Sequence, residues 1–143
     1  MRTVDELTER FRDQGLRVTP QRQAIFRLLH GDASHPTVET LHERARSDMP
    51  TISLKTVYQT VHDLEAMGEV ELIHLGTGSV RVDPNVEHAH HHLICTVCGK
   101  VRDVLVDVHD LRVPARDRRG FTVADVEVHF RGVCDDCADP QVS

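Results

Sequence analysis

Aromatic residues are scarce in this 143-residue chain: tryptophan is absent, and there are only one tyrosine and four phenylalanines. A hydrophobic core must therefore consist mainly of aliphatic side chains. No segment reaches the roughly 18 consecutive apolar residues that a transmembrane helix needs. The first residues carry charges at helical spacing, where a signal peptide would have an apolar segment. We therefore expect a soluble, cytoplasmic protein that does not insert into a membrane.

An excess of positive charge is also lacking, since the formal net charge is −6. Residues 1–82 hold ten Lys/Arg against twelve Asp/Glu, and residues 83–143 hold seven against eleven. A nucleic-acid partner would therefore have to be recognised by a local patch and not by overall charge. The length suits one medium domain or two small ones.

Only four cysteines occur, and they form two Cys-x-x-Cys pairs, Cys95 with Cys98 and Cys134 with Cys137. A tetrahedral zinc ion takes four thiolates, which two tight turns can deliver. Gly99 follows the first pair, as is typical of a knuckle turn. The alternatives are two disulfides or four buried thiols, and a reducing cytoplasm disfavours the disulfides. The spacing predicts one closed structural zinc (Zn2+) site.

A run of histidines precedes the first cysteine pair and comprises His88, His90, His91 and His92. Alternate residues of a strand share a face, so His90 and His92 would point to the same side. Carboxylates stand on both sides of the run in the sequence, at Asp83 and Asp103. Two imidazoles with carboxylates suit a divalent ion such as iron(II), manganese(II) or zinc(II). The alternative is a solvated polar tract that binds nothing.

Four helices are predicted in the first half of the chain, over 4–14, 20–30, 38–46 and 54–67. Thr19, Thr37 and Ser53 each stand at the N-cap position of one of the last three. Two strand-like segments follow, 69–75 and 79–82, joined by a turn centred on Thr77. This succession is typical of a winged helix-turn-helix domain, which we assign to residues 1–82.

The fourth helix has two different faces. Its inward stripe is Leu54, Val57, Val61 and Leu64, and its outward face carries Lys55, Thr56, Tyr58, Gln59 and His62. A helix about 21 Å long with hydroxyl, amide and phenol groups outward suits reading of a DNA major groove. The alternative is an ordinary solvated face, since such side chains are common on helix surfaces.

The C-terminal half predicts a small α/β domain over residues 88–143, after a hinge at residues 83–87. Strands are expected over 92–95, 101–106 and 122–130, with a short helix between 110 and 119. Three short strands bury little apolar area by themselves. We therefore expect a homodimer through this domain, and a zinc ion that contributes on the order of 10 kcal/mol to its folding.

Taken together, several motifs resemble the ferric uptake regulator superfamily of dimeric, metal-dependent bacterial repressors. They are Leu16–Arg22, His35–Thr37, Ile52–Tyr58, His90–Cys95, Cys98–Lys100 and Gly132–Cys134, spread over about Leu7 to Cys137. The resemblance implies an α+β fold, an N-terminal winged helix-turn-helix domain followed by a small α/β dimerisation domain with a structural zinc site. It also implies binding to palindromic operator DNA.

The resemblance further implies a regulatory metal site for Fe2+ or Mn2+, shared between the two domains. Its ligands are matched by His35, Asp83, His90, His92 and Asp103. Glu87 is an alternative to Asp83, because the hinge spacing differs by about one residue. The positions matching DNA contacts are Arg17, Gln21, Arg22, Ser53, Lys55, Thr56, Tyr58 and Gln59, with Arg17 directed to the minor groove.

Two features favour the peroxide-sensing branch of the superfamily. The position of Asp103 is Asp in that branch and Glu in iron sensors. A second metal site of many iron and zinc sensors falls on Ala89, His91, Asp110 and Val126, only two of which can bind a metal. The resemblance then implies that hydrogen peroxide, the only small-molecule signal expected, oxidises His35 or His90 and ends repression.

Three other functions are to be weighed. Within the superfamily, the alternative is an iron- or zinc-uptake repressor that senses metal level alone. An oxygenase is disfavoured because no cosubstrate-binding motif or general base is evident, so we expect no enzyme. A metal-storage module would leave the winged helix without a role.

Overall fold

The computed structural model describes residues 1–76 and 78–138. The chain forms two compact units, Met1–His88 and Ala89–Ser143. Thr77, at the centre of the predicted hairpin turn, and residues 139–143 of the predicted C-terminal domain lie outside the described residues. None of the helices in the described part of the chain is both long and apolar enough to span a membrane.

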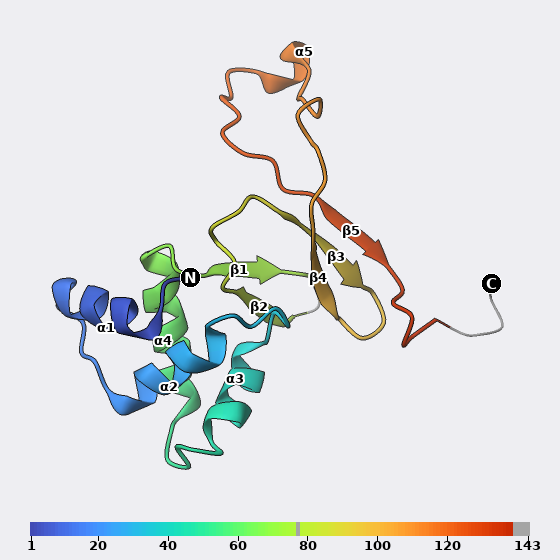
Figure 1. The fold of residues 1–143 in the computed structure, drawn as a ribbon. Helices are drawn as coiled ribbons and strands as arrows, with labels where there is room; N and C mark the ends of the chain where they lie inside the picture. Colours follow the sequence, from blue (N-terminus) through green and yellow to red (C-terminus); the bar gives the residue numbers. More distant parts are fainter. Residues whose placement is uncertain (77, 139–143) are drawn as a thin grey trace. The chain divides into compact units, whose positions relative to one another are not determined.

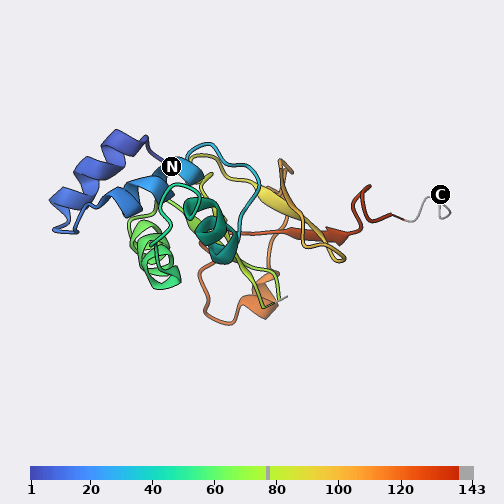
Figure 2. The same cartoon turned by 90° about the horizontal axis from the view of Figure 1, so that it is seen from below.

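Four helices form most of the N-terminal unit (Figures 1 and 2) and are α1 (Val4–Asp13), α2 (Pro20–Leu29), α3 (Val38–Ala45) and α4 (Leu54–Ala66). The side chains of Thr19, Thr37 and Ser53 cap the last three, each accepting a hydrogen bond from the backbone N–H three residues later. These bonds satisfy amide groups that have no partner inside the helix. The predicted helices are confirmed to within about one residue at each end.

The inner sides of the four helices pack into one core. Phe11 of α1 lies against Phe26 of α2, with ring centroids 4.8 Å apart. On α4, the predicted inward residues Val57, Val61 and Leu64 are buried. An aliphatic core with one aromatic pair at its centre agrees with the scarcity of aromatic residues in the sequence.

Two residues of α4 differ from the prediction. Leu54 was expected to point inward, and this is wrong, because the first turn of α4 reaches the surface and leaves its side chain 37% exposed. Thr60, in contrast, is fully buried. Its hydroxyl donates a 2.7 Å hydrogen bond to the carbonyl oxygen of Thr56, which satisfies the polar group inside the core.

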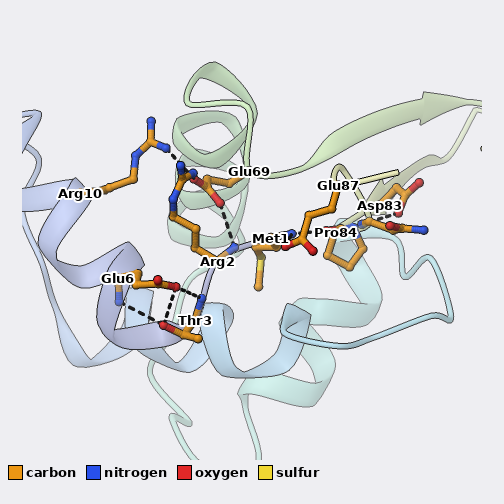
Figure 3. Close-up of polar contacts among 10 residues, drawn as sticks. Met1, Arg2, Thr3, Glu6, Arg10, Glu69, Asp83, Pro84 and Glu87 are labelled. Carbon is orange, nitrogen blue, oxygen red and sulfur yellow. Dashed lines mark hydrogen bonds and ion pairs between the residues drawn. The ribbon is translucent and has the colours of Figure 1, made fainter. Parts of the chain in front are cut away.

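A buried carboxylate ties the start of the chain to the segment after α4 (Figure 3). Glu69 accepts hydrogen bonds from the guanidinium groups of Arg2 and Arg10, the latter at 2.9 Å. Its side chain is 1% exposed, whereas both arginines remain partly exposed. In the same view, the amino group of Met1 donates to the carbonyl oxygen of Pro84 at 2.8 Å. The first residues are thereby fixed to both ends of the hairpin.

The predicted hairpin is confirmed as β1 (Glu71–His74) paired with β2 (Val80–Asp83), antiparallel. An isolated bridge joins Arg81 of β2 to Thr37, the N-cap of α3. The guanidinium of Arg81 also donates to the carbonyl oxygen of His35 at 3.3 Å. These contacts hold the end of β2, and with it Asp83, against the segment that precedes α3.

The C-terminal unit contains β3 (His91–Cys95), β4 (Val101–Val104), α5 (Ala115–Arg118) and β5 (His129–Gly132). The strand order is β4-β3-β5, with β3 antiparallel to β4 and parallel to β5. Figure 1 shows the segment that carries α5 extending away from this sheet. His91 and His92 of the histidine run, and the first knuckle cysteine, therefore lie on the central strand.

One predicted strand is wrong in its extent. Residues 122–130 were expected to be extended, but β5 begins only at His129 and continues to Gly132. Alternation of polar and apolar residues indicates which side chains would share a face. A strand also needs a neighbouring strand for its backbone hydrogen bonds. Within the described chain, β3 offers that pairing to His129–Gly132. Phe121 and Val123 remain exposed beside the unpaired stretch.

Candidate metal centres

The four cysteines converge into one cluster at the end of β3. Ligand atoms of Cys95, Cys98, Cys134 and Cys137 all lie within 4.8 Å of one another, and Sγ of Cys98 is 3.7 Å from Sγ of Cys134. A tetrahedral zinc ion with bonds of about 2.3 Å holds its sulfur ligands about 3.8 Å apart. All four cysteines are free thiols, so the predicted disulfide alternative is not found. The donor set and spacing fit a tetrahedral thiophilic ion.

Two tight turns deliver these thiols. After β3, the N–H of Gly99 donates to the carbonyl oxygen of Cys95 at 3.0 Å, and Gly99 has a φ of +73°, which favours glycine. In the second turn, the N–H of Cys137 donates to the carbonyl oxygen of Cys134 at 2.9 Å. A 2.7 Å ion pair between Lys100 and Asp136 links the two turns at the surface.

Interactions within the cluster shift the pKa values of its thiols in different directions. Backbone N–H groups, first that of Cys98 and then that of Cys134, lower the pKa of Cys95 to about 6. Hydrogen bonds to Cys98 and Cys134 raise the pKa of Cys137 to about 12. One thiolate is stabilised, but ionisation of all four sulfurs would place four negative charges within 4.8 Å of one another. A divalent cation at the centre would remove this repulsion and allow all four to ionise.

Three predicted regulatory ligands meet inside the C-terminal unit. His92 of β3 and Asp103 of β4 are direct register partners. Oδ1 of Asp103 lies 3.6 Å from Nε2 of His90 and 3.8 Å from Nε2 of His92. The two imidazole rings are 4.8 Å apart, edge to face. Two imidazole nitrogens thus converge on one carboxylate, a donor set that fits a borderline divalent ion.

The other two predicted ligands meet inside the N-terminal unit. Nε2 of His35 lies 3.7 Å from Oδ2 of Asp83, and both side chains are buried. His35 has a φ of +50°, an unfavourable left-handed conformation for a residue with a Cβ. Glu87, the alternative to Asp83, is exposed and lies 3.5 Å from the amino group of Met1. The carboxylate that accompanies His35 within this unit is therefore that of Asp83.

A carboxylate just before β5 and an imidazole on β5 also approach His92, and sequence reasoning did not assign them a role. Oε1 of Glu127 is 3.4 Å from Nδ1 of His92 and accepts a 2.6 Å hydrogen bond from Nε2 of His129. Burial alone would raise the pKa of Glu127, but the hydrogen bond and charge of His129, with the charge of His92, lower it. The alternation of residues 123–130 already placed Glu127 and His129 on one side, which was the available signal.

The positions of the second metal site expected in many iron and zinc sensors do not form a ligand cluster among the described residues. Ala89 and Val126 carry no donor atoms. Nδ1 of His91 accepts a 3.3 Å hydrogen bond from the backbone N–H of Val128. In the described chain, no group of three close potential ligands includes His91 or Asp110.

The outward face of α4 lies as predicted, with Lys55, Tyr58 and Gln59 exposed. The Tyr58 hydroxyl donates a 2.7 Å hydrogen bond to Glu39 on α3. Ser53 accepts the backbone N–H of Thr56, so both act in the cap of α4. This face presents hydroxyl, amide and ammonium groups together.

The predicted DNA-contacting residues of α2 and the segment before it differ in their surroundings. Arg17 is exposed and Gln21 is half-buried. Arg22 forms a 2.9 Å ion pair with Asp63 of α4, and its guanidinium carbon lies 5.4 Å from the centroid of the Phe11 ring. Arg22 therefore holds α2 and α4 together, whatever else it contacts.

Comparison with known proteins identifies the family. The model of the Ferric uptake regulator family matches residues 13–138 of the chain. The chain belongs to this family. Its predicted fold, a winged helix-turn-helix unit followed by a small α/β dimerisation unit, is the Ferric uptake regulator fold and is confirmed.

Three relatives of this Ferric uptake regulator family protein are informative. The Peroxide-responsive repressor PerR of Staphylococcus aureus (strain Mu50) is 34% identical over 95% of this chain and 92% of its own length. A zinc-bound manganese uptake regulator has a TM-score of 0.71 and 30% identity, covering 93% of this chain and 99% of its own. PerR from Streptococcus pyogenes, whose structure was solved to explain peroxide sensing and gene regulation, has a TM-score of 0.55 and 27% identity, covering 96% and 95%.

Proposed function

We propose that this protein is a metal-dependent, homodimeric transcriptional repressor that binds palindromic operator DNA and senses hydrogen peroxide. A structural zinc ion would occupy the four-cysteine cluster. One regulatory ion, Fe2+ or Mn2+, would be held jointly by His35 and Asp83 of the N-terminal unit and by His90, His92 and Asp103 of the C-terminal unit.

The observation that carries this proposal is that each unit holds part of one possible ligand set. The N-terminal unit offers one imidazole and one carboxylate, and the C-terminal unit offers two imidazoles and one carboxylate. An ion held by the C-terminal group alone would have open coordination positions, which His35 and Asp83 would fill. Sharing one ion would fix the relative orientation of the units only in the loaded protein. The two α4 helices of a dimer would then match successive major grooves, about 34 Å apart, only in that state.

Three observations favour peroxide sensing over sensing of metal level alone. The ligand at position 103 is Asp, as in the peroxide branch. The second site of many metal-level sensors lacks donors at Ala89 and Val126. The relative from Staphylococcus aureus is named a peroxide-responsive repressor. Iron(II), when bound, would supply the electrons that reduce hydrogen peroxide and direct its oxygen onto a ligating imidazole.

Oxidation of His35 or His90 would remove a donor nitrogen from the shared site. The two units would no longer be held at the DNA-binding angle, and repression would end. The four cysteines would be structural and would not take part in sensing, because zinc would occupy their thiolates. We propose that the protein acts as a regulator and not as an enzyme.

Exposed apolar residues support the homodimer. Leu105, Leu111, Phe121 and Val123 of the C-terminal unit are 48–82% exposed in the single chain. Apolar groups of this size gathered in one segment are typical of a surface that another chain covers. A second copy, bound through this segment, would complete the small core of the unit.

Metal titration tests the shared site. His35→Ala and His92→Ala are each expected to weaken Mn2+ binding by at least about tenfold, measured by calorimetry on the zinc-loaded protein. His74→Ala is the control, because His74 is an exposed histidine of β1. Retention of wild-type affinity by either ligand variant would show that no ion is shared between the units.

DNA release tests the signal. Operator sequences would first be selected from a random duplex pool with the Mn2+-loaded protein. The Fe2+-loaded protein is then expected to lose these sequences on peroxide treatment and to gain the mass of one oxygen atom on a peptide with His35 or His90. The Mn2+-loaded protein should keep both its mass and its DNA. Peroxide-insensitive DNA binding that follows metal level alone would favour the iron- or zinc-uptake repressor.

A further inference from the structure

His92 occupies the centre of the sheet and has a polar partner on each side. Asp103 of β4 and His129 of β5 are its register partners on the two neighbouring strands. Its two ring nitrogens face different carboxylates: Nε2 is 3.8 Å from Asp103, and Nδ1 is 3.4 Å from Glu127. The imidazole ring therefore stands between the regulatory ligands and a second acidic group outside them.

Glu127 is itself held in place. Its Oε1 accepts a 2.6 Å hydrogen bond from Nε2 of His129, and the same oxygen atom faces His92. The backbone fixes this arrangement, because the N–H of His92 donates to the carbonyl oxygen of Val128 at 3.2 Å. The residues on either side of Val128 are thereby anchored next to His92.

We propose that Glu127 is a positioning residue for the regulatory metal site, and that it acts by accepting the Nδ1–H of His92. The inference rests on the proposed function, because it assigns Nε2 of His92 to the shared ion. A neutral imidazole carries its hydrogen on one nitrogen and its lone pair on the other. Drawing the hydrogen to Nδ1 leaves the lone pair on Nε2, on the side of His90 and Asp103.

The carboxylate of Glu127 would also make the imidazole of His92 a stronger metal ligand. Hydrogen-bond partners of metal-binding histidines fix the ring orientation and raise ligand basicity. His129 would in turn keep Glu127 from turning into solvent, since the Glu127 side chain is 44% exposed. We thus expect Glu127, held by His129, to fix the orientation of the His92 ring without binding the regulatory ion itself.

A different role for these residues would be a second metal site, because potential ligand atoms of His92, Glu127 and His129 lie within 4.8 Å of one another. The contacts favour positioning. The Glu127 oxygen that would bind such an ion is already bonded to His129 at 2.6 Å. His92 would also have to bind one ion through each ring nitrogen, which requires it to lose both ring hydrogens.

The first test measures Mn2+ affinity of the full-length, zinc-loaded protein by calorimetry. Glu127→Ala is expected to weaken Mn2+ binding by about 10–100-fold. Glu127→Gln should lose less, because its amide oxygen can still accept the Nδ1–H. His129→Ala should lose least, since Glu127 remains. Asp125→Asn is the matched control, a nearby acidic residue on the same side of the alternation, and should bind as the wild type.

The second test needs no regulatory metal. Nitrogen-15 spectra of the imidazoles, recorded above the ordinary imidazole pKa, report which ring nitrogen of His92 carries the hydrogen. The wild type should carry it on Nδ1, and Glu127→Ala should shift it toward Nε2, while Glu127→Gln should restore the wild-type spectrum. A merely structural role for Glu127 would leave this pattern unmoved.

The outcomes separate the two proposals. If His92→Ala leaves Mn2+ affinity unchanged, the shared site itself is wrong and this inference falls with it. If His92→Ala weakens binding but Glu127→Ala does not, or if His92 keeps its tautomer in Glu127→Ala, the positioning role alone is overturned. A second equivalent of Mn2+ that disappears in Glu127→Ala would make Glu127 a ligand and likewise overturn it.

Discussion

The hydroxyl of Tyr58 on α4 donates a 2.7 Å hydrogen bond to the carboxylate of Glu39 on α3. Both side chains are exposed, so this bond holds the single tyrosine of the chain in one orientation on the face proposed to meet DNA. The O–H of Tyr58 is therefore already engaged by the carboxylate of Glu39 in the DNA-free protein. DNA must replace that group if it is to use the hydroxyl.

Substitutions at this pair should affect DNA binding in opposite directions. Tyr58→Phe removes the donor and is expected to weaken operator binding by about tenfold, the worth of a typical hydrogen bond. Glu39→Gln removes a negative charge from the same face and should strengthen binding, most clearly at low salt. Fluorescence anisotropy with the selected operator measures both. Weaker binding by Glu39→Gln would mean that the carboxylate is needed to orient the tyrosine.

The same bond predicts a pH dependence of stability. The hydrogen bond from Tyr58 lowers the pKa of Glu39 below its ordinary 4.5, and the bond to Glu39 raises the pKa of Tyr58 above its ordinary 10.0. Because the pKa of Glu39 is lowered, its carboxylate contributes stability above pH 4.5. This contribution is lost as pH falls through the lowered pKa. Because the pKa of Tyr58 is raised, its phenol contributes stability to the fold below pH 10.0. This contribution is lost as pH rises through the raised pKa. Urea unfolding should therefore show a wild-type advantage over Tyr58→Phe at neutral pH that vanishes at both extremes.

The cysteine cluster should dominate the stability of the C-terminal unit. Cys98→Ser, or removal of zinc by a chelator, is expected to unfold this unit, because a structural zinc site contributes on the order of 10 kcal/mol. Circular dichroism and zinc content measure the effect. Lys100→Ala is the matched control, since it removes only the exposed ion pair with Asp136, and such surface pairs contribute little to stability. A folded, zinc-free Cys98→Ser protein would contradict the structural role.

The buried Glu69 should be costlier to leave unpaired than to remove. Replacing both Arg2 and Arg10 by alanine leaves its carboxylate with no cation and only the backbone N–H of residue 2 as a donor, and is expected to destabilise the N-terminal unit by about 3 kcal/mol. Glu69→Gln leaves two partly exposed arginines and should cost clearly less. Arg12→Ala, at an exposed position of α1, serves as the control in urea unfolding. The reverse order of the two losses would show that Glu69 acts mainly through packing.

The backbone at His35 predicts a difference between two variants that both remove the imidazole. The left-handed φ of +50° costs about 1 kcal/mol for a residue with a Cβ and little for glycine. His35→Gly should therefore be more stable than His35→Ala, although both should lose the shared metal site. Thermal unfolding of the metal-free proteins measures this difference. Equal stability would mean that the loop relaxes once the imidazole is gone.

Local chemistry made much of this fold predictable. The hydroxyl caps Thr19, Thr37 and Ser53 precede apolar stripes, and all three helices begin where the caps indicate. The knuckle spacing was equally informative, because two Cys-x-x-Cys turns leave few other ways to satisfy four thiols. In each case, the signal and the structure that it predicts lie within a few residues of each other.

The wrong or missing predictions concern long-range pairing. Residues 122–128 alternate as a strand does, but the described chain provides a ladder partner only further along, from His129. Glu127 was visible as a polar residue, yet its contact with His92 depends on the parallel register of β3 and β5, which no short pattern specifies. The sharing of one metal ion between the two units came from family resemblance alone and remains a prediction.

β3 carries His92, a proposed ligand of the regulatory ion, and Cys95, a member of the four-cysteine cluster, with Leu93 and Ile94 between them. The two candidate metal centres thus share one short strand. We therefore expect an order of assembly, in which zinc binds the four thiols first and orders β3 before His92 can bind the regulatory ion. A chain made without zinc should then fail to respond to iron.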